Sequence, residues 1–471
     1  MEFKNLGQFK RKKVIVGIGL IFLLAVLGSD AKGSMIAGFF SSRVISVIPP
    51  SPSVPPEAKP LWTILEKINE AHNLLKNISL KVGDRDINYT ESRYASVNGK
   101  IITASRSFKE PEKEIALAAL NIKSGEIKIL TVTKRGADLI APAGWNVEVL
   151  ERPSGIRWNG RNTAYRVNSP ENYVVIANVY PNEKDTRVAQ KNKQGKTVYV
   201  TQRTIKYDLY APYSPDLHTS DLVISGQNYT KNMVAKAMEE LKFAGVKSKA
   251  IPKSLVTDVF ASKNNFFERI PLLEQTDLTE FEIDPKNTVE RAHVIIGANQ
   301  DKAFNTTCNS SSACGWVQFT PRTYAAIAKS YPSTKLIKDF KAGAADHLNS
   351  MKAAILLYDT NLKDFINIKG LGVLNDPSLE EYLASSYNGA PRHAKASLKA
   401  AILGGIQDWV QALSSKKGGI KDETRGYLVK LRWLQQNDRC CKFIKILIYL
   451  FKTNPMVLWS MPLLKISRNT Q

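Results

Sequence analysis

The residues of this chain that could take part in chemistry gather around a short stretch, residues 313–324. Small residues open it, and Gly315 tolerates a positive φ, so the backbone can pass close to a neighbouring group. Gln318 then stands among apolar residues, and a buried amide needs hydrogen-bond partners. Pro321 suits the first turn of a helix, which we expect over residues 322–330. The stretch therefore predicts a tightly packed loop that presents an amide just before a helix.

Three segments of the chain resemble motifs of lytic transglycosylases and the related lysozyme-like muramidases. Residues 315–319, Gly-Trp-Val-Gln-Phe, resemble the Gly-x-x-Gln motif. Residues 386–389 are similar to the segment Ala-Tyr-Asn-Ala-Gly, and residues 423–428 to Glu-Thr-x-x-Tyr-Val, in the same order as in that family. The resemblance covers residues 265–437. It implies a mainly helical, lysozyme-like domain that cleaves peptidoglycan between N-acetylmuramic acid and N-acetylglucosamine and leaves a 1,6-anhydro product.

The same resemblance implies which residues bind the glycan strand. Gln318 is expected to hydrogen-bond a sugar or the catalytic carboxyl, while Tyr387 and Asn388 are expected to line the same groove, with Tyr387 bonded to the acid. Ser312 and Gly315 complete the expected substrate-binding set, because they stand in the small-residue segment that precedes the glutamine of the motif.

Cleavage of a glycosidic bond needs a carboxyl group that is still protonated near neutral pH. In the family a single Glu acts first as acid and then as base, and the acetamido group of the substrate stabilises the positive charge. The commonest pattern, Glu-Ser-x-Phe, aligns with residues that begin at Asp301, whose side chain is one methylene too short, and a misplacement of ~1 Å is costly. A second branch has a long insert, and its alignment makes Glu274 the last residue of a helix over 265–274. We prefer Glu274 as the acid, with Asp301 as the first alternative and with Glu280, Glu282 and Glu290 as further candidates.

Other kinds of chemistry have weaker support in the sequence. The 5 histidines lack the spacing of zinc ligands, and we find neither a glycine-rich phosphate loop nor a nucleophile elbow, so we expect no metal and no cofactor. Cys308 and Cys314 stand close to the motif, and they either form a disulfide or remain separate thiols. We predict the disulfide, because an oxidising compartment favours it.

The first residues indicate that compartment. Five basic residues between Lys4 and Lys13 precede an apolar run over residues 14–28, which is the layout of a secretory signal or a signal anchor. We favour an uncleaved anchor over a cleaved signal, and hence a membrane-anchored protein of the cell envelope. The formal charge of +23 favours anionic partners. In that location the expected partners are the membrane and peptidoglycan glycan strands, and no nucleic acid is expected.

The elements that must position these residues divide the 471-residue chain into an α+β multidomain protein. We expect an anchor (1–48), a proline-rich linker (49–60), a β-rich accessory domain with flanking helices (61–260), a mainly α lysozyme-like domain (261–437) and a basic apolar tail (438–471). The tail is either an amphipathic membrane-surface helix or a non-native extension of the reading frame.

Secondary structure is expected as follows. Expected strands lie at 99–103, 114–120, 127–132, 172–177 and 198–201, and expected helices at 62–75, 220–242 and 289–299. Trp145, Trp158 and Tyr165 could form a sugar-stacking surface, although aromatic strand residues are more typical of a core. The alternative function is a catalytically inactive wall-binding or scaffolding protein with a lysozyme-like domain, because Asp301 stands where the common pattern has its Glu.

Overall fold

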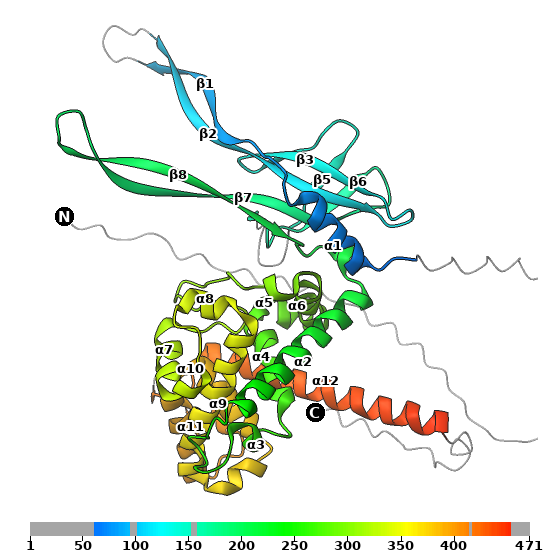
Figure 1. Cartoon of the computed structure of the whole chain (residues 1–471), viewed down its shortest axis with the longest axis vertical. Helices are drawn as coiled ribbons and strands as arrows, with labels where there is room; N and C mark the ends of the chain where they lie inside the picture. The colour runs from blue at the N-terminus through cyan, green and yellow to red at the C-terminus, as the bar shows by residue number, and fades with distance from the viewer. Residues whose placement is uncertain (1–60, 95–100, 152–157, 414–416, 454–471) are drawn as a thin grey trace, which may run out of the picture. The chain divides into compact units, whose positions relative to one another are not determined.

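The computed structural model describes residues 61–94, 101–151, 158–413 and 417–453. The predicted anchor and the proline-rich linker lie outside these residues. The described residues form a mixed α+β protein with a β-rich middle and a helical C-terminal part, as expected (Figure 1). Among the described helices, none combines the length and the apolar character that crossing a bilayer would require.

The β-rich part is an antiparallel sheet with an additional hairpin. In the sheet the strand order is β4-β3-β2-β7-β8, and β1 also pairs with β2, while β5 and β6 pair only with each other. The strands are β1 Val82–Tyr94, β2 Ile101–Asn121, β3 Ile127–Arg135, β4 Asp138–Ile140, β5 Asn146–Val149, β6 Tyr165–Ser169, β7 Tyr173–Lys191 and β8 Thr197–Tyr210.

Several strands are longer than the sequence predicted. The expected strands 99–103 and 114–120 belong to one strand of 21 residues, β2, whose first half pairs only with β1. Likewise β7 and β8 continue beyond the sheet as a two-stranded ribbon (Figure 1). The side chains of β7 and β8 in this ribbon are mostly exposed. Because neither face is buried there, the sequence lacks the apolar alternation that identifies a strand.

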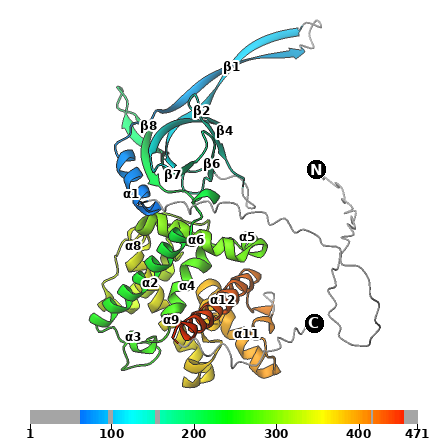
Figure 2. The ribbon, with the colours of Figure 1, turned by 90° about the vertical axis from the view of Figure 1, so that its right-hand side faces the viewer.

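The two faces of the sheet bury alternate residues of β2. Ala116, Ala118 and Leu120 pack on one face with helix α1 (Ile64–Leu75). Ile115, Leu117 and Ala119 face the other way, toward the β5–β6 hairpin, inside the curved sheet that Figure 2 shows. Tyr165 is buried in this second cluster, and Trp145 and Trp158 are partly buried and pack against it.

Helices follow the sheet, and most of the predicted ones are present. They are α2 Ser220–Phe243, α3 Val256–Val259, α4 Asn264–Gln275, α5 Leu278–Ile283, α6 Pro285–Asn299, α7 Pro321–Ser330, α8 Phe340–Ala345, α9 His347–Lys369, α10 Leu379–Gly389, α11 Pro391–Gly404 and α12 Asp422–Thr453. Pro321 occupies the first turn of α7, as the sequence predicted, and Thr320 caps this helix.

Helices α2 and α6 pack together unusually closely. A Cβ atom at Gly226 of α2 would overlap the His293 carbonyl oxygen of α6, and one at Gly297 of α6 would overlap the Leu222 carbonyl oxygen of α2. Helix α2 also packs against α4 and α9. The boundary at residue 260 stays a prediction, and α2, which precedes it, contributes to the packing of the helical part.

The last helix continues into the predicted tail. Helix α12 runs to Thr453, past the expected domain end at 437. Residues 438–453 contain good helix formers such as Arg, Lys and Leu, and the first proline after the start of α12 stands at position 455. The two readings of the tail, a membrane-surface helix and a non-native extension, both stay predictions.

Candidate active site

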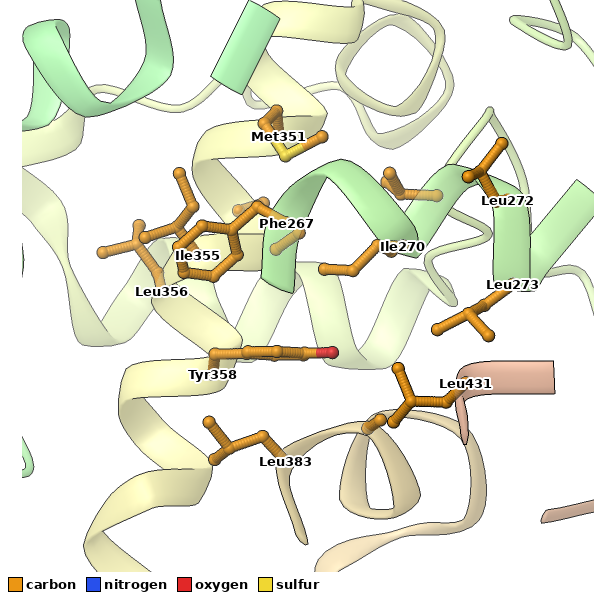
Figure 3. Close-up of a cluster of buried hydrophobic side chains, with 14 of the residues drawn as sticks. Phe267, Ile270, Leu272, Leu273, Met351, Ile355, Leu356, Tyr358, Leu383 and Leu431 are labelled. Atoms are coloured by element: carbon orange, nitrogen blue, oxygen red, sulfur yellow. The ribbon is translucent and has the colours of Figure 1, made fainter. Parts of the chain in front are cut away.

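Helix α4 brings Glu274 to a cleft. Its apolar residues Phe267, Ile270 and Leu273 recur at helical spacing and are buried, so this side of the helix is fixed in the core. Figure 3 shows this face of α4 packed near Tyr358 of α9 and Leu431 of α12. Glu274 stands in the last turn of α4, half-buried, as the sequence predicted for residues 265–274.

The cleft has a volume of about 540 Å³, within the ~300–1,000 Å³ typical of ligand sites. The ends of α4 and α12 form one wall, and α6 and the segment after it form another. The lining residues are Asn162, Leu273, Glu274, Gln275, Thr276, Asp277, Leu278, Arg291, Ile295, Phe304, Thr307, Cys308, Asn309, Gln318, Asn388, Glu423, Tyr427 and Lys430. Each of the three family-like segments therefore contributes to the cleft that contains Glu274, through Gln318, Asn388 and Tyr427.

The surroundings of Glu274 favour the protonated form of its carboxyl group, which a general acid needs. Burial raises its pKa to about 7, an effect that Tyr427 and Lys430 oppose and Glu423 supports. The hydroxyl of Tyr427 donates a hydrogen bond of 2.8 Å to Glu274 Oε1. Burial also raises the pKa of Tyr427 well above its ordinary value, so this hydroxyl keeps its proton and remains a donor. With Oε1 oriented in this way, the second oxygen can carry the acidic proton.

Lys430 fixes the backbone on which Glu274 stands. Its buried ammonium group donates to the carbonyl oxygens of Leu273 at 2.6 Å and Thr276 at 2.9 Å, at the end of α4 where carbonyls lack helical partners. Burial lowers the pKa of Lys430 to about 8. Lys430 is not among the site residues predicted from the sequence. Its position three residues after Tyr427 could have indicated it, because this spacing places the two side chains on one face of a helix.

Gly315 supports the glutamine of the motif. Its φ is +81°, and a Cβ atom there would overlap the carbonyl oxygen of Ala344, so both the conformation and the space require glycine. The Gly315 carbonyl accepts bonds from Gln275 Nε2 at 3.1 Å and Gln318 Nε2 at 2.7 Å. Because Gln275 follows Glu274, this carbonyl connects the motif loop to the end of α4. Gly315 is buried, and it supports the cleft without lining it.

Gln318 lines the cleft, and two backbone carbonyl oxygens fix the orientation of its side-chain amide. Its Nε2 group donates to the carbonyl oxygens of Gly315 and, at 3.1 Å, of Thr307. Both amide hydrogens are thus used, which leaves the side-chain oxygen as an acceptor. The backbone of Gln318 has φ +48°, and Phe304, also in the cleft, has φ +56°. Such conformations cost of order 1–3 kcal/mol each in residues other than glycine and cluster at functional sites.

The other predicted binding residues have different surroundings. Asn388 lines the cleft, and its Oδ1 accepts a 2.8 Å bond from Thr424 Oγ1. Tyr387 was expected to bond to the acid, but its hydroxyl donates to the Val317 carbonyl oxygen at 2.5 Å. The hydroxyl that donates to Glu274 is that of Tyr427. Ser312 is exposed and does not line the cleft, because it lies in the tight turn of the disulfide loop.

The alternative acids do not line this cleft. Asp301 lies exposed in a short 3₁₀ turn, Gln300–Lys302, after α6. Glu280 is buried in an ion pair with Arg291, and Glu290 is hydrogen-bonded to His218 at 3.1 Å. Glu282 is exposed on α5. Of the carboxylates considered as the acid, the structure therefore brings only Glu274 to the motif residues.

Cys308 and Cys314 are joined in a disulfide, as predicted. The bond closes the segment that leads from Thr307 to Gly315, and Cys308 and Asn309 line the cleft. Within the described part of the chain, no group of three or more His, Cys, Asp or Glu side chains is arranged to hold a metal ion.

Comparison of the chain with family models, with curated proteins and with solved structures finds no match.

Proposed function

We propose that this protein is a membrane-anchored lytic transglycosylase that cleaves peptidoglycan glycan strands with Glu274 as its single acid and base. The observation that carries the proposal is the carboxyl of Glu274, whose pKa is raised to about 7, in a cleft beside Gln318 and Asn388. The lysozyme-like character of the helical part, the envelope location and the anchor are parts of the same proposal, supported by the three motifs and by the basic and apolar N-terminus.

The reaction begins with the protonated carboxyl of Glu274. It donates its proton to the glycosidic oxygen while the bond from that oxygen to C1 of the N-acetylmuramic acid unit breaks. The acetamido oxygen of the same sugar bonds to C1 and stabilises the positive charge. The carboxylate of Glu274 then removes the proton of the 6-hydroxyl, whose oxygen attacks C1 and displaces the acetamido oxygen. The product is a 1,6-anhydro sugar, and Glu274 is again protonated.

Each neighbouring residue has a definite part in these steps. Tyr427 keeps one carboxyl oxygen bonded at 2.8 Å, so the other oxygen faces the substrate. Gln318 offers an acceptor oxygen, which suits a sugar hydroxyl or the N–H of an acetamido group. The amide nitrogen of Asn388 has no hydrogen bond to the described residues and can donate to the strand.

The test compares two substitutions of similar size. Glu274→Gln keeps the shape but loses the acidic proton, and general acid catalysis contributes ~10²–10⁴-fold, so the release of fragments from purified peptidoglycan should fall at least ~100-fold. Asp301→Asn should remain close to wild type. Fragments released by the wild type should carry 1,6-anhydro ends, which mass spectrometry detects as a loss of water relative to hydrolysis products.

The reverse result would refute the assignment of the acid. Full activity of Glu274→Gln together with loss in Asp301→Asn would show that the common alignment of the motif is correct. A wild type that binds glycan strands but releases no fragments would favour the wall-binding or scaffolding alternative.

A further inference from the structure

The β-rich part reaches the cleft. Asn162, which stands shortly before β6, lines the same cleft as Glu274 and is half-buried. The other lining residues come from α4 and the segments that follow it. Nothing in the motifs concerns Asn162, because it lies far outside residues 265–437.

The loop of residues 158–163 is held rigidly within the β-rich part. Thr163 Oγ1 accepts bonds from the backbone N–H groups of Asn159 at 3.1 Å and Gly160 at 3.2 Å. The Gly160 carbonyl accepts a 2.9 Å bond from the buried amide of Asn178. Gly160 has φ +77°, and a Cβ atom there would lie 2.6 Å from Tyr180, so the loop passes directly over β7. The position of Asn162 is therefore set by the sheet.

Arg161 then fixes the loop to the wall of the cleft. Its guanidinium group forms two bonds to Asp208 of β8, at 2.5 and 2.8 Å. It also donates to Asn305 Oδ1 at 2.8 Å and to the Lys302 carbonyl at 3.3 Å. Residues 302–305 include the lining residue Phe304 and lead to the lining residue Thr307. Asn162, which follows Arg161, is thus placed beside that wall.

We propose that the loop of residues 158–163 forms a binding subsite for an N-acetylated sugar unit of the glycan strand, at a distance from the bond that is cleaved, with Asn162 as its recognition residue. The inference deepens the proposed function and depends on it. No hydrogen bond to the side-chain amide of Asn162 is present among the described residues, so the amide can donate to and accept from the acetamido and hydroxyl groups of a sugar. Thr307, Asn309 and the ring of Phe304 supply further polar groups and an apolar surface in the same cleft.

The experiment measures binding by the full-length chain with Glu274→Gln, in which cleavage does not remove the ligand. Isothermal titration with a chitin hexasaccharide and with a chitin disaccharide compares a strand that spans the cleft with one that occupies only part of it. Asn162→Ala should raise the Kd for the hexasaccharide by about 3- to 10-fold, as expected for one lost hydrogen bond, and leave the Kd for the disaccharide unchanged. Asn162→Asp, which keeps the size but loses the donor, should give a similar result.

The matched control is Asn182→Ala, an exposed asparagine on β7 that does not line the cleft and should change neither Kd. An unchanged hexasaccharide Kd in both Asn162 variants would overturn the subsite and leave the proposed function intact. An equal rise in the Kd of both the hexasaccharide and the disaccharide would place Asn162 next to the reacting sugars and would also overturn the inference. A wild type that neither binds nor cleaves any glycan would overturn the subsite and the proposed function together.

Discussion

An acid that works near neutral pH needs surroundings that disfavour its charged form, and Glu274 shows what this costs. Its pKa rises from its ordinary value of 4.5 to about 7 because the carboxyl is buried. The folded protein therefore binds this proton more tightly than the unfolded chain does. The stability that follows is fully present below pH 4.5 and is lost as the pH rises to about 7.

This difference predicts how stability depends on pH. Relative to Glu274→Gln, the free energy of unfolding of the wild type should decrease by about 3 kcal/mol as the pH rises from below 4.5 to above 7. Urea unfolding of both proteins at a series of pH values measures the difference. Parallel curves for the two proteins would contradict a raised pKa at Glu274.

Lys430 should affect the pH dependence of activity. Its cation lowers the pKa of Glu274, so Lys430→Met should raise that pKa and move the alkaline decline in activity to higher pH. Lys430→Arg, which keeps the charge, is the control. The pH profile of fragment release is the measurement. A uniform loss of activity with an unshifted profile would mean that Lys430 only holds the end of α4.

At the scale of the elements, the loop of the motif depends on one glycine. Gly315→Ala would place a Cβ atom against the Ala344 carbonyl oxygen in addition to the strain of φ +81°. Gly418→Ala is the matched control, since Gly418 has φ +80° and no described residue has an atom within 4 Å of the added Cβ atom. The control should lose about 1 kcal/mol from strain alone, and Gly315→Ala at least ~2 kcal/mol more from overpacking. Denaturant unfolding compares them, and equal losses would contradict the close approach.

The elements that the sequence predicted well are those with one buried face. Phe267, Ile270 and Leu273 identified α4, and hence Glu274 at its end, because their spacing matches the helical period. The ribbons of β1–β2 and β7–β8 bury neither face, so the sequence lacks the apolar alternation from which the length of these strands could be predicted. For Lys430 the spacing from Tyr427 indicates only a shared helix face. Its role depends on carbonyl groups at the end of α4, far away in the chain, which that spacing does not encode.

At the scale of the whole molecule, the sheet and the helices share one of their cores. The cluster of Ala116, Ala118 and Ile176 in the sheet includes Leu222 of α2 and Val294 of α6. The buried amide of Asn299 adds a polar connection, because it both donates to and accepts from the backbone of Ala211 at 2.8 Å. This junction is adjacent in sequence to the turn that Arg161 contacts, so the position of Asn162 depends on it.

A shared core predicts that the sheet and the helices unfold together. Val294→Ala removes two methyl groups from the cluster and should cost about 2 kcal/mol, by analogy with other core truncations. Hydrogen exchange measured by mass spectrometry should then show equal losses of protection in peptides from β2, β7 and α9, whose amides open in the same cooperative unit. Val198→Ala, on the exposed ribbon of β8, should leave these peptides unchanged. If the helices lost protection while β2 and β7 kept theirs, the two parts would be independent, and a cleft that includes Asn162 would have no fixed geometry.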